Sequence, residues 1–479
     1  MRRTIGILLA LTACAGPETS SDEAATSATI VEPLAAEGPS AEELEQERIA
    51  REYPMEATVR LFQAAVKARP SRDAETIGFI RRGVTVRARS TDAGEGCKEG
   101  WLELHPEGFF CRGFDVIVGE ELPEDQRDLT PPRRHDDLPY DYYFVTLEDA
   151  PVMRRKPNPK EREAVVHWLS RLRHHRRLGD EKKLERFLAD ALPDEPSKPR
   201  FVDRLLARGY YVSSPKGLPP EGRLIRNAQG EYLLADTLKK VDASELRGVE
   251  LGGEIQLPFG FVTRPVRPLR VIRDEGGVRF EEDPDEEPLP RYAHLPGAKP
   301  TVLVGDFLVH ELADGRVLKD WFAGVAEKID PPFKVKDDEV WIHVDIGEQT
   351  LVLYRGKTPF FATLVSTGVD GHDTPQGLFR IEKKFVGRTM NDVSPDTPKG
   401  DRYRIEDVPF TQYFQGSYAL HAAFWHDRFG TRRSHGCVNL SPHDARVVFE
   451  STSPALHDGW FGTYADGKRV LGTRVYITP

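Results

Sequence analysis

Short segments in which apolar and polar residues alternate recur along this chain, and they constrain its fold more than any other feature. Between residues 64 and 104 four such segments are separated by Gly and Pro, among them Val84–Ala88 and Gly100–Leu104. Three more follow one another from Val340 to Ser366. Alternation with a period of two places apolar side chains on one face of a strand. The sequence therefore predicts a mainly β protein, with small barrel-like modules ahead of a C-terminal sheet domain.

Helical signals are fewer and more local. Apolar residues at helical spacing between residues 165 and 188 predict a helical insertion. Ser441, Pro442 and Asp444 form a typical helix start and predict a short helix that ends near Phe449. Residues 140–335 otherwise form a mixed region. Two similar phrases within it, VTLEDAPVMRR and VTRPVRPLRVIR, suggest degenerate β repeats with helices between them.

The first residues are typical of an export signal. Arg2 and Arg3 precede the apolar run Ile5–Ala10, which leads into Leu-Thr-Ala before Cys14. This ending resembles a bacterial lipobox, and an ordinary secretory signal is the alternative. We expect residues 1–13 to be a lipoprotein signal peptide and Cys14 to carry the lipid that anchors the protein to a membrane. The polar residues 14–53 then form a disordered tether, and the protein is a periplasmic lipoprotein of the cell envelope.

Composition and cysteine usage support an exported protein. The formal charge is −10, so the chain lacks the basic footprint of a nucleic-acid-binding protein. No run of 18 apolar residues occurs that would predict a membrane-spanning helix. Because disulfides form outside the reducing cytosol, we expect Cys97 and Cys111, which lie 14 residues apart in one segment, to form a disulfide. Cys437 is then an unpaired thiol, which calls for a functional explanation.

Cys437 lies in a segment with the chemistry of a nucleophile. The segment reads Ser434-His435-Gly436-Cys437-Val438-Asn439, and His421 precedes it. A thiol is activated by a nearby imidazole, and a Gly beside it permits backbone angles that aim N–H groups at an oxyanion. Either His435 or His421 could be the base. The alternative is a zinc site formed from His421, His426, His435, Cys437 and His443, but these lack the close paired spacing of zinc ligands.

This pattern resembles the L,D-transpeptidase (YkuD-like) catalytic domain. His421 and the SHGCVNL segment carry the resemblance, together with IHVDIGEQTLVLYRGKTPFFATLVSTG and DTPQGLFRI upstream, so that it covers residues 338–478. It implies a β-sandwich-like fold with a short helix, Cys437 as the nucleophile and His421 as the general base. It further implies that Ser434, His435, Gly436 and Asn439 line the site and that Trp425 is its aromatic. Ala422 departs from the Gly or Ser that often follows the base, so a backbone carbonyl or another group must orient His421.

The resemblance also implies the reaction. Acyl transfer through a Cys437 thioester would release a terminal D-Ala and join two peptidoglycan stem peptides by a 3→3 cross-link, with no metal or organic cofactor. Transfer to water or to a protein amine would instead make a carboxypeptidase or a protein-to-wall ligase, and a non-catalytic wall-binding lipoprotein is the remaining alternative. Carbapenem β-lactams are the expected inhibitors. Residues 54–118 weakly resemble bacterial Src-homology-3-like domains, which suggests a module that binds glycan or peptide, or a structural spacer.

Overall fold

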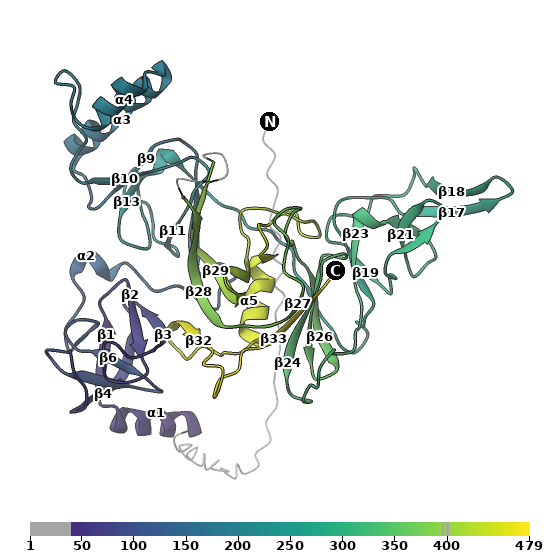
Figure 1. Ribbon diagram of the computed structural model, residues 1–479, viewed down its shortest axis with the longest axis horizontal. Helices are drawn as coiled ribbons and strands as arrows, with labels where there is room; N and C mark the ends of the chain where they lie inside the picture. Colours follow the sequence, from purple (N-terminus) through teal and green to yellow (C-terminus); the bar gives the residue numbers. More distant parts are fainter. Residues whose placement is uncertain (1–39, 395–396, 399–401) are drawn as a thin grey trace, which may run out of the picture. The chain divides into compact units, whose positions relative to one another are not determined.

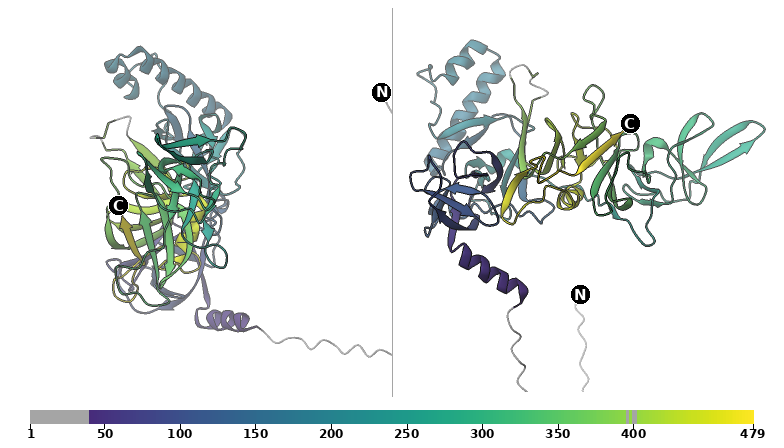
Figure 2. Two further views of the ribbon diagram at one scale, coloured as in Figure 1. Left: turned by 90° about the vertical axis from the view of Figure 1, so that its right-hand side faces the viewer. Right: turned by 60° about the horizontal axis from the view of Figure 1, so that its bottom comes forward.

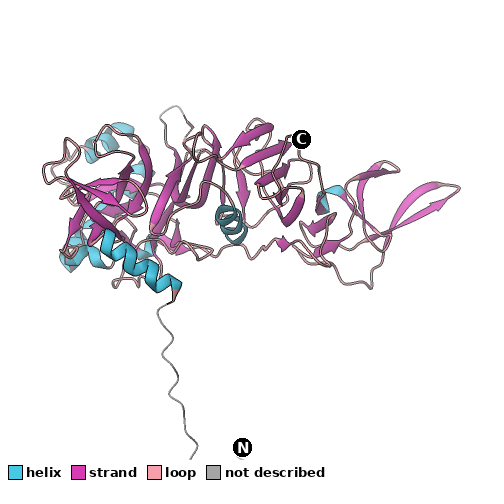
Figure 3. Ribbon diagram, turned by 90° about the horizontal axis from the view of Figure 1, so that it is seen from below, coloured by secondary structure: helices cyan, strands magenta, loops and turns pink. Residues whose placement is uncertain are grey.

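The computed structural model describes residues 40–394, 397–398 and 402–479 of the chain. The described residues divide into two units, one that ends at Arg48 and one that runs from Ile49 to Pro479. The expected signal peptide and the lipidation site Cys14 lie outside the described residues. The described part is mainly β, as the sequence predicted, with strands far outnumbering helices (Figure 3). No helix of this part is both long and apolar enough to cross a bilayer.

Helix α1, Ala41–Glu52, lies where the sequence predicted the end of a disordered tether over residues 14–53. That prediction was wrong for these residues. The Glu43 N–H donates to Ser40 Oγ at 3.2 Å, and Glu43 Oε2 accepts from the Ser40 N–H at 2.6 Å. This capping box precedes a run of Ala, Glu and Arg, all of which favour helices. The low aromatic content that suggested disorder is equally typical of an exposed helix.

Residues 55–118 form the N-terminal β module. Its seven strands pair antiparallel in the order β3-β2-β6-β5-β4-β1-β7 around a small apolar core that includes Phe110. A disulfide joins Cys97 to Cys111 on β6. A short helix, α2 (Glu124–Arg127), follows the module. The strands are β1 (Met55–Val59), β2 (Gln63–Lys67), β3 (Thr76–Arg81), β4 (Thr85–Thr91), β5 (Trp101–Leu104), β6 (Phe109–Cys111) and β7 (Val116–Val118).

The middle region contains one local arrangement twice. In the first repeat β8 pairs with β14, with Phe144 opposite Lys239, and in the second β16 pairs with β23, with Phe261 opposite Gly324. A short 3-10 helix precedes the second strand each time, at Ala235–Thr237 and Asp320–Phe322. The strands of residues 140–240 are β8 (Tyr140–Val145), β9 (Ala150–Met153), β10 (Val202–Leu206), β11 (Tyr211–Pro215), β12 (Leu224–Arg226), β13 (Tyr232–Leu234) and β14 (Leu238–Lys240). Those of residues 249–326 are β15 (Val249–Glu250), β16 (Phe259–Val262), β17 (Leu269–Asp274), β18 (Gly277–Glu282), β19 (His294–Pro296), β20 (Val302–Val304), β21 (Phe307–Glu311), β22 (Val317–Lys319) and β23 (Ala323–Ala326).

A helical hairpin is inserted between β9 and β10 of the first repeat (Figure 2). Asn158 caps helix α3 (Pro159–Leu178) in a full capping box, and Gly179 ends it in a left-handed conformation. Asp180 then caps α4 (Glu181–Leu188). The two helices pack through Trp168 and Phe187, whose rings stack with centroids 6.1 Å apart. The helical spacing read from the sequence therefore corresponds to a real pair of helices.

The C-terminal domain has two sheets that share one apolar core with helix α5, Pro442–Ser451 (Figure 1). The first sheet has the order β15-β26-β25-β24-β33-β27, and the second contains the long pair β28–β29 together with β30, β31 and β32. The strands are β24 (Val340–Asp345), β25 (Thr350–Arg355), β26 (Thr358–Leu364), β27 (Gly377–Arg380), β28 (Lys383–Asp392), β29 (Tyr403–Gln415), β30 (Tyr418–Ala422), β31 (Val438–Leu440), β32 (Trp460–Tyr464) and β33 (Arg474–Thr478).

The second sheet continues into two other parts of the chain. Strand β32 pairs with β3 of the N-terminal β module, with Phe79 opposite Gly462. Strand β29 pairs in parallel with β11 of the first repeat, with Tyr211 opposite Ile405. Asp407 on β29 lies where these parts meet and accepts hydrogen bonds from Arg81 at 2.5 Å and from Ser213 at 2.6 Å. The middle region is thus joined to the C-terminal domain by backbone pairing as well as by side chains.

Candidate active site

Cys437 immediately precedes β31, and His421 lies on β30. The two strands run parallel, with His421 opposite Asn439 and Leu420 opposite Val438. Parallel pairing brings residues that are far apart in sequence to the same level of a sheet. Both Cys437 and His421 line one cavity of about 620 Å³. The sheet register therefore brings the two residues together at one site.

The backbone around Cys437 is held by Ser434. The Ser434 hydroxyl donates to the carbonyl oxygen of Cys437 at 2.5 Å and accepts from the Gly436 N–H at 3.1 Å. Gly436 has a φ of 103°, and a Cβ at this position would come within 2.3 Å of the Tyr418 ring. Glycine is therefore required both for the conformation and for the close approach. The Gly436 N–H already donates a hydrogen bond to Ser434. It is therefore not one of the N–H groups that were expected to point at an oxyanion.

His421 is buried and oriented by a backbone carbonyl. Its Nδ1 lies 3.0 Å from the carbonyl oxygen of Ala422. A carbonyl only accepts, so Nδ1 carries the proton and Nε2 of the neutral ring is free to accept one. Of the two expected ways to orient His421, a backbone carbonyl or another group, the structure has the backbone carbonyl. Burial lowers the pKa of His421 to about 4, although the bond to Ala422 opposes this shift. The ring is therefore neutral at pH 7 and available as a base.

Burial acts on the Cys437 thiol in the opposite direction. It raises the pKa of the thiol to about 11, with a smaller opposing contribution from the Ala419 N–H. The thiol Sγ lies 3.8 Å from the carbonyl oxygen of Ser417. At neutral pH the site thus holds a protonated thiol beside a neutral imidazole. Such a pair needs proton transfer during attack, because a thiolate is not formed in advance.

The other residues expected at the site fall in or beside the same cavity. Trp425 lines it, and its ring lies 5.7 Å from that of His421. Asn439 lines it too, with Nδ2 3.2 Å from His426 Nε2. His435 is exposed at the cavity, and its ring packs edge-on against His372 at 4.4 Å. His421 rather than His435 has the buried ring and fixed tautomer that suit a base.

Comparison with known proteins identifies the part of the chain that carries this site. Residues 339–477 match the family described as YkuD, the L,D-transpeptidase catalytic domain. This region is an L,D-transpeptidase catalytic domain. The resemblance read from the sequence over residues 338–478 is thereby confirmed.

Parts of the chain are similar to known proteins. YciB of Bacillus subtilis (strain 168), itself named only provisionally as an L,D-transpeptidase, is 28% identical over 130 residues. The match covers 24% of this chain and 63% of YciB, so the chain spans less than two thirds of that relative. The catalytic domain of an E. faecium L,D-transpeptidase is 20% identical, with 29% of this chain and 98% of that one covered at a TM-score of 0.23. An L,D-transpeptidase from Mycobacterium smegmatis is 18% identical, and the match covers 50% of this chain and 98% of that one at a TM-score of 0.24.

The cavity of the L,D-transpeptidase domain includes residues that sequence reasoning did not select. Tyr403, Tyr413 and Tyr418 line it from β29 and β30. Burial raises the pKa values of Tyr403 and Tyr413, and proximity to Cys437 adds to the shift at each. Gly209 and Tyr211 come from the first repeat. Arg433, next to the SHGC segment, and Tyr418, three residues before His421 on β30, had a signal in their positions, whereas the others reach the site through tertiary pairing.

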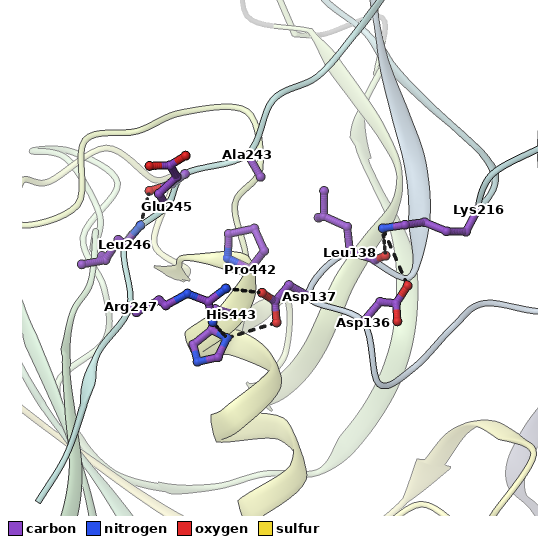
Figure 4. A pocket seen from close by; sticks show the side chains of 11 residues that line it. Asp136, Asp137, Leu138, Lys216, Ala243, Glu245, Leu246, Arg247, Pro442 and His443 are labelled. Carbon is purple, nitrogen blue, oxygen red and sulfur yellow. Dashed lines mark hydrogen bonds and ion pairs between the residues drawn. The ribbon is translucent and has the colours of Figure 1, made fainter. Parts of the chain in front are cut away.

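His443, a member of the alternative zinc set, lies at a different place. It lines a separate cavity of about 450 Å³ near the start of α5 (Figure 4). Its Nδ1 is 3.1 Å from Asp137 and also contacts Arg247, as the dashed lines show. Within residues 40–479, apart from the undescribed positions, no group of three His, Cys, Asp or Glu side chains is arranged to hold a metal ion.

Proposed function

We propose that this protein is a cysteine acyltransferase that cross-links peptidoglycan stem peptides, with Cys437 as its nucleophile. One observation carries the proposal: a thiol and a neutral imidazole with a free Nε2 line the same cavity of an L,D-transpeptidase domain. The site offers the nucleophile and the base that covalent acyl transfer needs. The residues of the site include no other candidate for either role with the same burial and orientation.

In the first half-reaction Cys437 Sγ attacks the carbonyl of the third residue of a stem peptide. His421 Nε2 accepts the thiol proton during the attack, and the tetrahedral intermediate carries the negative charge on its oxygen. Its collapse breaks the peptide bond, and the departing D-Ala amine takes the proton back from His421. The product is a thioester on Cys437. Dividing the transfer into two steps lowers each barrier.

In the second half-reaction the neutral side-chain amine of a neighbouring stem attacks the thioester. The amine passes its proton through His421 to the departing sulfur, and a 3→3 amide cross-link forms while Cys437 is restored. Ser434 keeps the nucleophile in place throughout, because it bonds both the Cys437 carbonyl and the Gly436 N–H. Water or a protein amine could replace this acceptor without any change in the first half-reaction.

The test is mass spectrometry of wall fragments after incubation of purified protein with tetrapeptide-containing peptidoglycan. We expect 3→3 cross-linked dimers and free D-Ala with wild-type protein, and neither with Cys437→Ala. Tripeptides without dimers would identify a carboxypeptidase, and stems joined to protein would identify a ligase. The proposal would be overturned if the folded protein left the wall unchanged and a carbapenem did not acylate Cys437. A wall-binding role would then be the remaining function.

We also propose that the mature protein begins at a lipidated Cys14 and is a periplasmic lipoprotein. The support is the Leu-Thr-Ala-Cys sequence after a short apolar run. Cys14→Ala should move the protein from the membrane fraction to the soluble fraction, which immunoblotting would detect. A variant that still sediments with membranes would place the anchor elsewhere.

A further inference from the structure

The charged side chains that line the catalytic cavity are of one sign. Arg388, Arg402 and Arg433 line it, and none of its described lining residues is Asp or Glu. Histidines, tyrosines and uncharged side chains form the rest of the surface. A partly enclosed cavity with cations and no lining carboxylate attracts anions more strongly than an open surface does.

Two of these arginines are not neutralised within the described part of the chain. Arg388 on β28 hydrogen-bonds the Tyr413 side chain, and its guanidinium lies 5.2 Å from the Phe385 ring. Arg433 is fixed through its backbone N–H, which donates to Thr367 at 2.8 Å. Neither forms an ion pair with a described carboxylate, whereas the neighbouring Arg432 lies 3.6 Å from Asp370. The side-chain charges of Arg388 and Arg433 therefore remain available to a ligand.

The two arginines reach the cavity from different parts of the chain. Arg433 directly precedes the Ser434–Cys437 turn that holds the thiol. Arg388 follows Gly387 on β28 and hydrogen-bonds the side chain of Tyr413, which lines the cavity too. A substrate that occupies the cavity at Cys437 can therefore meet both guanidinium groups. Guanidinium groups bind carboxylates through paired hydrogen bonds.

We infer that Arg388 and Arg433 bind carboxylate groups of the donor stem peptide. Through these two residues the enzyme selects stem peptides with free carboxylates over stem peptides whose carboxylates are amidated. The inference rests on the proposed function for the identity of the substrate. It extends that function, since it names the charge state of the substrate and the residues that recognise it. Each bound carboxylate fixes the peptide along the cavity, with the scissile carbonyl left at the thiol.

The experiment measures binding, so that it does not depend on turnover. Cys437→Ala protein is titrated by calorimetry with a synthetic tetrapeptide stem that carries free carboxylates, and with the same peptide after amidation of every carboxylate. Arg388→Gln and Arg433→Gln are introduced singly in the same background. Arg432→Gln is the matched control, because it removes an adjacent arginine that does not line the cavity.

We expect the free peptide to bind at least about 10-fold more tightly than the amidated one, as for other charge-assisted hydrogen bonds. Arg388→Gln and Arg433→Gln should each weaken binding of the free peptide about 10-fold and leave the amidated peptide unaffected. Arg432→Gln should change neither affinity more than about twofold. Equal affinity for both peptides, no binding at all, or losses matched by Arg432→Gln would overturn the inference. If this binding pattern holds while wild-type protein fails to modify the wall, only the proposed reaction is wrong.

Discussion

At the scale of single residues, the chemistry of the site depends on how burial shifts the pKa values of His421 and Cys437. Burial lowers the pKa of His421 to about 4 and raises that of Cys437 to about 11. Between about pH 4 and about pH 11 both groups are uncharged. At neutral pH the thiol is therefore protonated and does not react with electrophiles unless a base accepts its proton. The reaction then needs a base held in one tautomer, which the bond from His421 to the Ala422 carbonyl provides.

The pH dependence of Cys437 acylation by a carbapenem tests this assignment. With wild-type protein the rate should fall as the pH drops through about 4, because protonated His421 no longer accepts the thiol proton. His421→Ala should lose about 10²–10⁴-fold near neutral pH. Its rate should then rise as the pH approaches about 11, where the thiol ionises unaided.

Two variants serve as controls for that measurement by intact-protein mass spectrometry. His435→Ala should acylate within about tenfold of wild type, because its exposed ring is not needed as the base. Cys437→Ala should not acylate at all. A large loss in His435→Ala with normal acylation of His421→Ala would reverse the roles of the two histidines.

At the scale of elements, helix α5 connects the nucleophile segment to the core. It begins two residues after β31, and Ser441 caps it by accepting the Asp444 N–H at 3.2 Å. The Asp444 side chain is fully buried and accepts from the Gly248 N–H at 2.8 Å and from Thr363 at 2.5 Å. One carboxylate thus joins the helix start to β26 and to the segment that precedes β15.

Asp444→Ala should lower the free energy of unfolding by about 2–4 kcal/mol, because it removes the acceptor of the half-buried Gly248 N–H and of the buried Thr363 hydroxyl. Burial raises the pKa of Asp444 to about 6, so the folded protein holds this proton more tightly than the unfolded chain. The stability from that shift is present at low pH and is lost as the pH rises through about 6. The difference between wild type and variant should therefore be larger at pH 4.5 than at pH 7.5 in urea unfolding. Glu450→Ala, a change on the exposed side of the same helix, should cost less than about 1 kcal/mol at both pH values.

The elements differ in how far the sequence could predict them. The start of α5 was predictable because Ser441 and Pro442 act locally, within one helical turn. The segment from Val340 to Ser366 gave three strands because the alternation of its apolar and polar residues has the period of a strand, although β24 and β25 are buried on both faces. Helix α1 was missed because composition alone does not separate an exposed helix from a tether. The pairing of β11 with β29 joins Tyr211 to Ile405, and no local pattern reports a contact across that separation.

The same distinction applies to the candidate site. His421 and Cys437 could be selected from the sequence because their types and spacing carry a chemical meaning. Tyr211 and Arg388 could not, since their presence in the cavity depends on which strands pair. The function of Ser434 also needed the structure, because its hydroxyl bonds the backbone of its own turn.

At the scale of the whole molecule, Asp407 joins three parts of the chain. It accepts from Arg81 of the N-terminal β module and from Ser213 of the first repeat, and its own carbonyl accepts from the Tyr142 hydroxyl at 2.7 Å. The Arg81 guanidinium lies between the rings of Phe62 and Phe461, at 3.9 Å from each. This ion pair is almost completely buried, with 6% and 4% of the two side chains exposed. Strand β29, which lines the catalytic cavity, is therefore held by contacts from both neighbouring parts.

A double-mutant cycle on Arg81 and Asp407 measures that dependence. Arg81→Met keeps most of the apolar stem but leaves a buried carboxylate, and Asp407→Asn leaves a buried guanidinium. Asn is chosen because residue 407 has a φ of 46°, which Asn tolerates. Each single variant should lose about 3–5 kcal/mol in urea unfolding, and the double variant should lose clearly less than the sum, since it leaves no unpaired charge. Arg87→Met, which removes an exposed pair with Glu56 in the same module, should cost less than about 1 kcal/mol. Additive losses in the double variant would show that the two side chains stabilise their own parts separately and that the junction does not depend on this pair.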